Sequence, residues 1–141
     1  MFVKIKKLSP DAIIPTYAKE GDAGMDLTAL TAENDPNGFY TEYGTGLAME
    51  IPEGHAGFIF PRSSASKTSQ IQANCVGVID SGYRGEIKVR LKNLGNPQKL
   101  YVAGDRVAQI IIMPVPEVKF FQTDQLSETV RGDGGFGSTG N

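Results

Sequence analysis

Residues 85–94 read GEIKVRLKNL, and apolar and cationic side chains alternate strictly through the middle of this run. The apolar positions are Ile87, Val89 and Leu91, and the cationic positions are Lys88, Arg90 and Lys92. A period of two predicts a β-strand with one buried and one solvated face. We therefore expect the three cationic side chains of this strand to point to solvent.

Shorter runs on the N-terminal side of this strand, at residues 3–6 and 47–51, alternate in the same way. Turn signals rich in Gly, Pro, Asn and Asp separate the runs, at 35–38, 52–54, 95–97 and 103–105. Ten-residue windows lack a helical period, although 64–72 leaves room for a short helix. Short strands with Gly/Pro turns predict an all-β fold, a jelly-roll-like antiparallel β-barrel or sandwich.

Length and composition narrow the classes of protein. The 141 residues suit one domain, and a net charge of −2 gives no basic surplus for nucleic-acid binding. One His and one Cys cannot build a disulfide or a His/Cys zinc site within one chain. No run approaches the roughly 18 apolar residues of a membrane span, and the start does not resemble a signal peptide. We expect a soluble, cytoplasmic protein that binds neither nucleic acid nor membrane.

The composition changes near the C-terminus. Residues 122–129 are polar, and 131–141 contain five glycines in eleven residues. Such a sequence cannot add to a hydrophobic core. We therefore divide the chain into a β-domain, residues 1–121, and a flexible glycine-rich C-terminal arm, residues 122–141.

A first polar cluster, Arg62, Ser63 and Ser64, follows the apolar run at residues 58–60. A cation beside two hydroxyl groups and the free amides of a turn can cradle a phosphate. The alternative is an ordinary turn at the end of a strand, with a surface arginine.

A second polar cluster occupies residues 77–85, immediately before the strongest strand. Asp80 follows two apolar residues, and a carboxylate at the rim of an apolar pocket can act as general base for a water molecule. Tyr83 lies three residues further and could stack against a sugar. The alternative is hairpin-turn chemistry alone, since Asp80 and Gly82 suit such a turn.

The third cluster is the glycine-rich end, residues 131–140. It lacks the lysine of a P-loop, and the chain ends before a helix could follow. Glycine-rich backbone can still surround phosphate oxygens, Arg131 can pair with them, and Phe136 offers a ring for base stacking. The alternative is a flexible linker.

Taken in order, five segments of this chain resemble the five motifs of the trimeric dUTPase family. They are AGMDLTA at 23–29, PRSS at 61–64, GVIDSGYRGE at 77–86, GDRVAQ at 104–109 and RGDGGFGSTG at 131–140. The resemblance implies hydrolysis of dUTP to dUMP and pyrophosphate with Mg²⁺ on the triphosphate. It also implies a dUTPase-like (β-clip) subunit in a homotrimer whose shared active sites are closed by the C-terminal arm of another subunit.

The resemblance further assigns roles to single residues. It makes Asp80 the carboxylate that activates water, Tyr83 the ring against the deoxyribose, and Asn74 a uracil contact. Backbone of the same hairpin reads the uracil edge and crowds out the thymine methyl, with Gly77, Val78 and Ile79 as candidates. Lys88 is a further candidate for substrate binding. The remaining candidates are assigned to phosphate binding, the uracil lid and the arm: Arg62, Ser63, Ser64, Gln109, Arg131, Phe136, Gly137 and Ser138. No residue is expected to bind the metal directly, and Asp26 acts on it through water or organises the site.

Several alternatives stay open at this point. The related dCTP deaminases share an Arg-Ser-Ser element and an Ile-Asp-x-Gly-aromatic turn, but the arm and the Tyr83 spacing favour a dUTPase. A trimer that binds an additional regulatory protein partner in its dUTP-bound state, or one without catalysis, belongs to a different class. For a dUTPase, the expected role is to limit uracil incorporation into DNA and to supply dUMP for dTMP synthesis.

Overall fold

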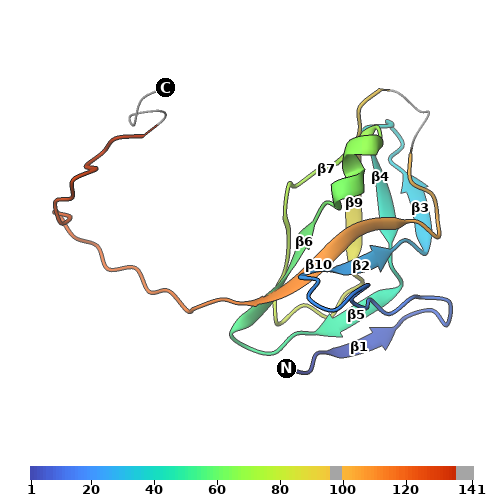
Figure 1. The fold of residues 1–141 in the computed structure, drawn as a ribbon, viewed down its shortest axis with the longest axis horizontal. Helices are drawn as coiled ribbons and strands as arrows, with labels where there is room; N and C mark the ends of the chain where they lie inside the picture. The colour runs from blue at the N-terminus through green and yellow to red at the C-terminus, as the bar shows by residue number, and fades with distance from the viewer. Residues whose placement is uncertain (96–99, 136–141) are drawn as a thin grey trace.

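The computed structural model describes residues 1–95 and 100–135, which form ten β-strands and one short 3₁₀ helix (Figure 1). The strands are β1 (Lys4–Lys7), β2 (Met25–Thr28), β3 (Thr31–Asn34), β4 (Tyr40–Gly44), β5 (Leu47–Glu50), β6 (His55–Phe60), β7 (Gln70–Gln72), β8 (Gly77–Ile79), β9 (Lys88–Asn93) and β10 (Arg106–Pro114). The helix, η1, spans Ser63–Lys67. Strands β4, β6 and β10 begin one or two residues after the turn signals at 35–38, 52–54 and 103–105.

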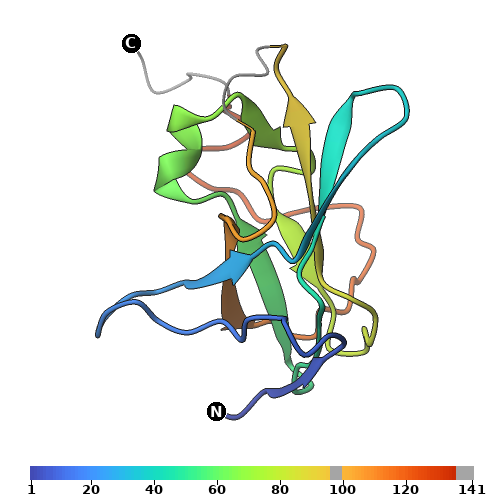
Figure 2. The ribbon, with the colours of Figure 1, turned by 90° about the vertical axis from the view of Figure 1, so that its right-hand side faces the viewer.

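Three antiparallel sheets make up the body of the molecule. Two have four strands each, in the orders β2-β10-β6-β8 and β3-β4-β9-β7, and β1 pairs with β5 in a third. Figure 2 shows the strands of the two larger sheets in separate layers around a common interior. The sheets do not close into one barrel, so the expectation of an all-β antiparallel fold is confirmed in its sandwich-like form.

The core lies between these layers and follows the alternation in the sequence. Ile87 is fully buried, and Val89 and Leu91 on β9 are nearly so. Leu27, Ile59, Val107 and Ile110 face them from the other large sheet, in the same cluster of buried residues. Lys88, Arg90 and Lys92 are exposed, as the period of two predicts.

Two local expectations are resolved by the strand pairing. The short helix considered for 64–72 forms only as η1 and ends at Lys67, because β7 begins at Gln70 and pairs with β9. The hairpin expected at Asp80 does not form, since β8 pairs with β6 whereas β9 pairs with β4 and β7. The turn at Asp80, closed by the Tyr83 N–H on the Asp80 carbonyl at 3.0 Å, instead carries the chain from one sheet to the other.

The register of the β2-β10-β6 sheet brings three of the sequence segments together. Gln109 on β10 lies opposite Asp26 on β2 and opposite Phe60 on β6. The segment at 61–64 begins directly after Phe60, so Arg62 lies close to Asp26 and Gln109. Segments about 35 and 45 residues apart in sequence thus meet at one end of a single sheet.

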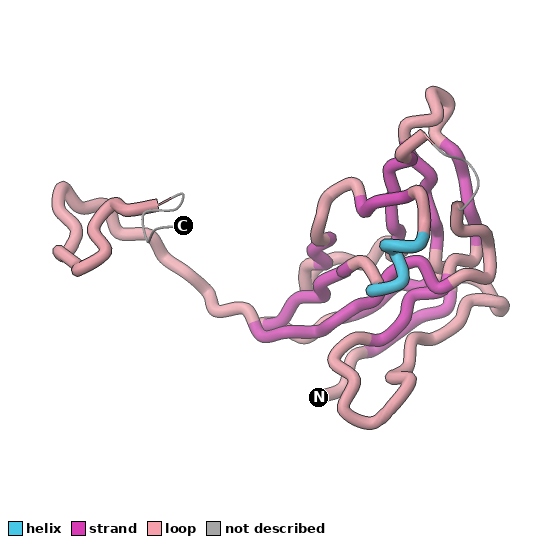
Figure 3. Tube along the Cα trace, turned by 45° about the horizontal axis from the view of Figure 1, so that its top comes forward, coloured by secondary structure: helices cyan, strands magenta, loops and turns pink. Residues whose placement is uncertain are grey.

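Beyond Pro114, residues 115–135 contain no strand or helix and run away from the body (Figures 1 and 3). Their apolar side chains lie in solvent; Phe120 is 98% exposed and Phe121 is 90% exposed. In the part of the chain that the structure describes, no helix is long and apolar enough to cross a membrane.

Candidate active site

A cavity of about 570 Å³ opens beside the turn that follows β8. Seven of the candidate residues line it: Asn74, Gly77, Val78, Ile79, Asp80, Tyr83 and Lys88. Asp80 and Val78 are exposed, whereas Gly77 is buried against Ile59. The structure therefore brings the expected general base, the ring of Tyr83 and the residues expected to contact uracil to one cavity.

The wall formed by β8 offers unpaired backbone. Among the strands that the structure describes, β8 stands at the edge of its sheet and pairs on one side only, with β6. An edge strand presents N–H and C=O groups that no neighbouring strand uses. Asn74 lies just before it, with its Oδ1 accepting a hydrogen bond of 3.2 Å from Gln72. The cavity thus combines backbone donors and acceptors with an amide side chain.

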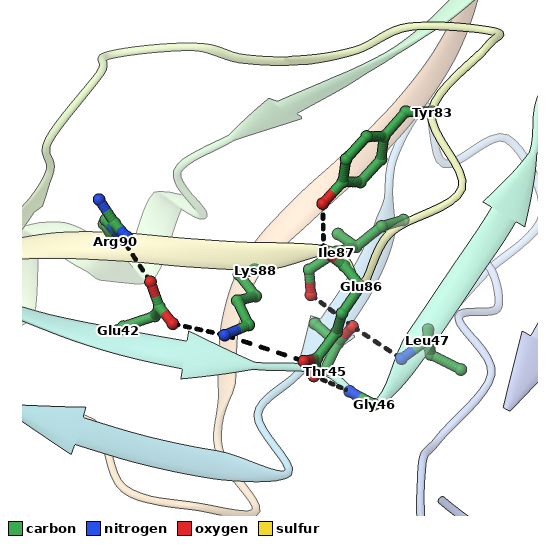
Figure 4. Close-up of polar contacts among 9 residues, drawn as sticks. All are labelled: Glu42, Thr45, Gly46, Leu47, Tyr83, Glu86, Ile87, Lys88 and Arg90. Carbon is green, nitrogen blue, oxygen red and sulfur yellow. Dashed lines mark hydrogen bonds and ion pairs between the residues drawn. The ribbon is translucent and has the colours of Figure 1, made fainter. Parts of the chain in front are cut away.

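On the opposite wall, Lys88 and Arg90 share one carboxylate, that of Glu42 on β4 (Figure 4). The Lys88 Nζ lies 2.6 Å from Glu42 Oε1, and the Arg90 Nε lies 2.7 Å from Oε2. Hydrogen bonds from Lys88 and then Arg90 lower the pKa of Glu42 below its ordinary value of 4.5, and the same bonds raise the pKa of both cations. Two of the three cations expected simply in solvent are therefore paired.

This ion cluster predicts a pH-dependent contribution to stability. Because the pKa of Glu42 is lowered on folding, its contribution is present above pH 4.5 and is lost as the pH falls through the folded-state pKa. We expect Glu42→Gln to be less stable than the parent at pH 7, with a difference that shrinks steadily below pH 4.5. Urea unfolding from pH 7 to pH 3 measures it, with Glu53→Gln in the exposed β5–β6 turn as control. A difference that stays constant with pH would contradict the assignment.

A second cavity, of about 520 Å³, lies at the end of the β2-β10-β6 sheet. Asp26 organises it: Oδ1 accepts a hydrogen bond from the Arg62 Nε at 2.6 Å, and Oδ2 accepts one from the Arg106 Nη1 at 3.0 Å. Arg62 also donates to the Ser64 hydroxyl at 2.9 Å. One carboxylate thus holds two guanidinium groups, which leaves a net positive charge and fits an anionic ligand.

Gln109 is fixed in the same cavity. Its Nε2 donates to the Pro61 carbonyl at 3.0 Å. A Cβ atom at position 24 would lie 2.5 Å from the Gln109 Oε1, so Gly24 leaves the space that this side chain fills. Ser63 lines this cavity, whereas Ser64 lines an adjoining one of about 350 Å³ with Arg62 and Lys67. The first, second and fourth segments therefore meet, as the sheet register requires.

Among the described residues, the Asp80 cavity and the Asp26 cavity have no lining residue in common. Within one chain, the expected general base and the expected phosphate cradle thus belong to separate hollows. Arg131 is in neither, because it is exposed on the C-terminal segment and its Nε donates to the Gly134 carbonyl at 3.0 Å. Phe136, Gly137 and Ser138 lie outside the described residues.

Six charged residues that line the Asp80 and Asp26 cavities were not candidates from the sequence: Lys19, Asp22, Glu42, Glu86, Arg90 and Arg106. Glu42 and Arg90 flank Lys88, and Arg106 completes the Asp26 cluster. Arg106 stands inside the GDRVAQ segment, so the sequence held a signal for it. Glu42 carried none, because it meets the β9 cations only through the pairing of β4 with β9, which places it opposite Arg90.

The described residues contain no group of three or more His, Cys, Asp or Glu side chains placed to hold a metal ion. Both oxygens of Asp26 accept hydrogen bonds from guanidinium groups. A metal held by protein side chains alone therefore finds no ready donor set in this part of the chain, whereas one carried by a phosphate ligand would need none.

Known proteins are similar to this chain over nearly its whole length. The dUTPase family model matches residues 10–140. The deoxyuridine 5'-triphosphate nucleotidohydrolase of Thermobifida fusca is 46% identical, with 98% of this chain and 78% of the relative covered. That of Crocosphaera subtropica is 44% identical over 99% of both chains.

The fold gives the same answer. The structure of the Staphylococcus bacteriophage 80alpha dUTPase with dUPNHPP aligns with a TM-score of 0.83 at 27% sequence identity, and the alignment covers 99% of each chain. The five sequence segments, the two cavities lined by the first four of them, and these full-length similarities all indicate one family. The chain belongs to the dUTPase family.

Proposed function

We propose that this protein hydrolyses dUTP to dUMP and pyrophosphate, with Asp80 as the general base. The observation that carries the proposal is the cavity in which Asp80, Tyr83 and Asn74 meet at an edge strand. Family membership and relatives named for this activity support it. The expected role in limiting uracil in DNA and supplying dUMP follows from the same reaction.

In the proposed reaction, the Asp80 carboxylate accepts a proton from a water molecule as its oxygen attacks the α-phosphorus. A bond forms between this oxygen and the α-phosphorus, and the bond to the oxygen that bridges to the β-phosphate breaks. That bridging oxygen leaves with pyrophosphate, and dUMP keeps the new oxygen. The exposed position of Asp80 at the cavity leaves room for both the water and the phosphate.

Base and sugar would be recognised around the same turn. Uracil presents one N–H donor between two carbonyl acceptors, which the free edge of β8 and the Asn74 amide can match. The edge is built by Gly77, Val78 and Ile79. We assign the ring of Tyr83 to the face of the deoxyribose, where it leaves no room for a ribose 2′-hydroxyl. Lys88, held by Glu42, adds a cation to the wall of this cavity.

The triphosphate would lie against the second cavity. Arg62 is preorganised by Asp26, and Ser63, Ser64 and Gln109 add neutral donors beside it. Preorganised donors and cations supply most of the stabilisation in phosphoryl chemistry. We assign Arg131 to the γ-phosphate, and Phe136, Gly137 and Ser138 to the part of the arm, residues 122–141, that covers the nucleotide.

We place Mg²⁺ on the triphosphate. Mg²⁺ prefers phosphate oxygens and retains several waters, which fits a site with no protein cage among the described residues. When bound there, it would neutralise charge on the departing pyrophosphate. A contact from Asp26 to the water shell of the ion stays a prediction, since in this structure Asp26 holds Arg62 and Arg106.

We further propose a homotrimer with shared active sites. The Asp80 cavity and the Arg62 cavity are separate within one chain, so a complete site needs the Asp80 cavity of one subunit against the Arg62 cavity of the next. The exposed apolar side chains of residues 115–130 support contact with another subunit, because a chain in isolation leaves them in water.

The experiment that tests the activity is pyrophosphate release with Mg²⁺, measured in parallel on dUTP, dTTP, dCTP and UTP. We expect turnover of dUTP alone, because the β8 edge would reject cytosine and crowd the thymine methyl, and Tyr83 would reject ribose. Ammonia release from dCTP would point instead to the deaminase relatives. No turnover of any of the four would refute the proposal.

A further inference from the structure

The ring of Tyr83 is folded back onto its own turn. Its hydroxyl donates a hydrogen bond of 3.0 Å to the backbone carbonyl of Glu86 (Figure 4). The ring also lies directly over Gly85, where a Cβ atom would fall within 2.9 Å of three ring and hydroxyl atoms. The side chain is nevertheless 44% exposed, so part of its surface remains free for a ligand. The orientation of Tyr83 therefore depends on where the Glu86 carbonyl lies.

Glu86 is itself tied to a different part of the fold. Its Oε1 accepts a hydrogen bond of 2.8 Å from the backbone N–H of Gly46, in the turn between β4 and β5. A Cβ atom at Gly44 would lie 2.8 Å from the same oxygen, so the turn is open at the point where the carboxylate enters. The carboxylate thus bridges the Asp80–Gly85 turn and the β4–β5 turn (Figure 4).

The next residue is held to the same turn by its backbone. The Ile87 N–H donates to the Leu47 carbonyl at 2.8 Å, and the Ile87 carbonyl accepts from the Thr45 hydroxyl at 2.7 Å. The position of residue 87 therefore does not depend on the Glu86 side chain. The peptide that carries the Glu86 carbonyl is held at its C-terminal end by the backbone contacts of Ile87. At its N-terminal end, Glu86 is held by the contact of its own carboxylate with Gly46.

We propose that Glu86 is a positioning residue for Tyr83, and through this ring a determinant of sugar specificity. The inference rests on the proposed contact between Tyr83 and the deoxyribose. Without the carboxylate, residue 86 loses its hold on Gly46. The carbonyl keeps its direction, because the Ile87 N–H of the same planar peptide stays on Leu47, but the turn that carries Tyr83 loses its anchor and can shift relative to this carbonyl. The ring then no longer closes the space at the sugar 2′ position. Discrimination between dUTP and UTP should then fall, beyond any general loss of activity.

The matched pair of variants is Glu86→Ala and Glu86→Gln. A glutamine keeps an Oε1 acceptor for the Gly46 N–H and loses only the charge that faces Lys88 Nζ, 4.0 Å away. We expect Glu86→Ala to lower the ratio of kcat/KM for dUTP over UTP about fivefold, the factor that corresponds to one neutral hydrogen bond. Glu86→Gln should keep the parental ratio.

The Tyr83→Phe variant is an independent test, because it removes the hydroxyl group that donates to the Glu86 carbonyl. It should lower the ratio by a similar factor, and the double variant Glu86→Ala/Tyr83→Phe should be no worse than either single one, since both remove one connection. Additive losses in the double variant would show that Glu86 acts by another route and would overturn the proposal.

The remaining outcomes also decide whether the role proposed for Glu86 holds. A Glu86→Ala protein with the parental dUTP-to-UTP ratio overturns the inference, even if its unfolding midpoint or total activity falls. Should Glu86→Ala fail to fold, an unchanged ratio in Tyr83→Phe overturns it instead. A parent protein that turns over no dUTP refutes the proposed function itself, and this result is distinct from an altered or unaltered ratio in the variants.

Discussion

Replacing Asp80 by asparagine should lower the turnover of dUTP at least about a hundredfold, while dUTP still binds. The amide has the shape of the carboxylate but cannot take the proton from the attacking water. Asp80 is exposed in a turn closed by backbone, so the substitution leaves the core and the β8 pairing in place. The loss should therefore appear in kcat, with little change in stability.

Pyrophosphate release measures the turnover, and a dUTP-dependent rise in the unfolding temperature measures binding. Asp11→Asn, an exposed position in the turn that follows β1, is the matched control and should keep parental turnover. Turnover near the parental rate in Asp80→Asn would remove Asp80 from the role of general base. Loss of binding together with turnover would instead indicate a role in holding the nucleotide.

The strands were predictable because their signal is local. The side chains on β9 face the core or solvent according to their position in the alternation, and Lys88 and Val89 show this directly. The turn at Asp80 has local signals too, but these describe a tight turn and not the sheets that it connects. Strand partners depend on contacts distant in sequence, and the hairpin expected there was wrong for that reason.

The same distinction separates the parts of the candidate site. Residues within one segment, such as Asp80 and Tyr83, could be grouped from their spacing. The pairing of Glu42 with Lys88 and Arg90 depends on the register of β4 against β9, which no single strand encodes. Likewise, Asp26 meets Arg106 only across the β2–β10 register, which is irregular between Arg106 and Ala108. Motifs contain Asp26 and Arg106 but not Glu42, Lys88 or Arg90. The contacts of all five residues depend on how the strands pair.

Removing residues 131–141 should abolish the turnover of dUTP and leave the assembly intact. The deletion takes away Arg131, the proposed γ-phosphate partner, and the covering segment that would exclude water from the site. Loss of one charge-stabilising donor already costs about 10²–10³ in turnover, so loss of the whole segment should exceed this. The strands and the apolar residues of 115–130 remain, so sedimentation should give the same oligomer as for the full chain. A fully active truncated chain would refute the covering role.

Coexpression of two inactive chains then tests where the arm acts. The truncated chain keeps Asp80 but has no arm, and the full-length Asp80→Asn chain keeps the arm but has no base. If the arm covers an Asp80 cavity of another subunit, mixed assemblies contain sites with both an intact base and an arm, and part of the activity returns. If each arm covers the Asp80 of its own chain, no such site exists and the mixture stays inactive. The separation of Arg131 from both cavities within one chain favours the first outcome, because a site whose parts do not meet in one subunit must be assembled between subunits.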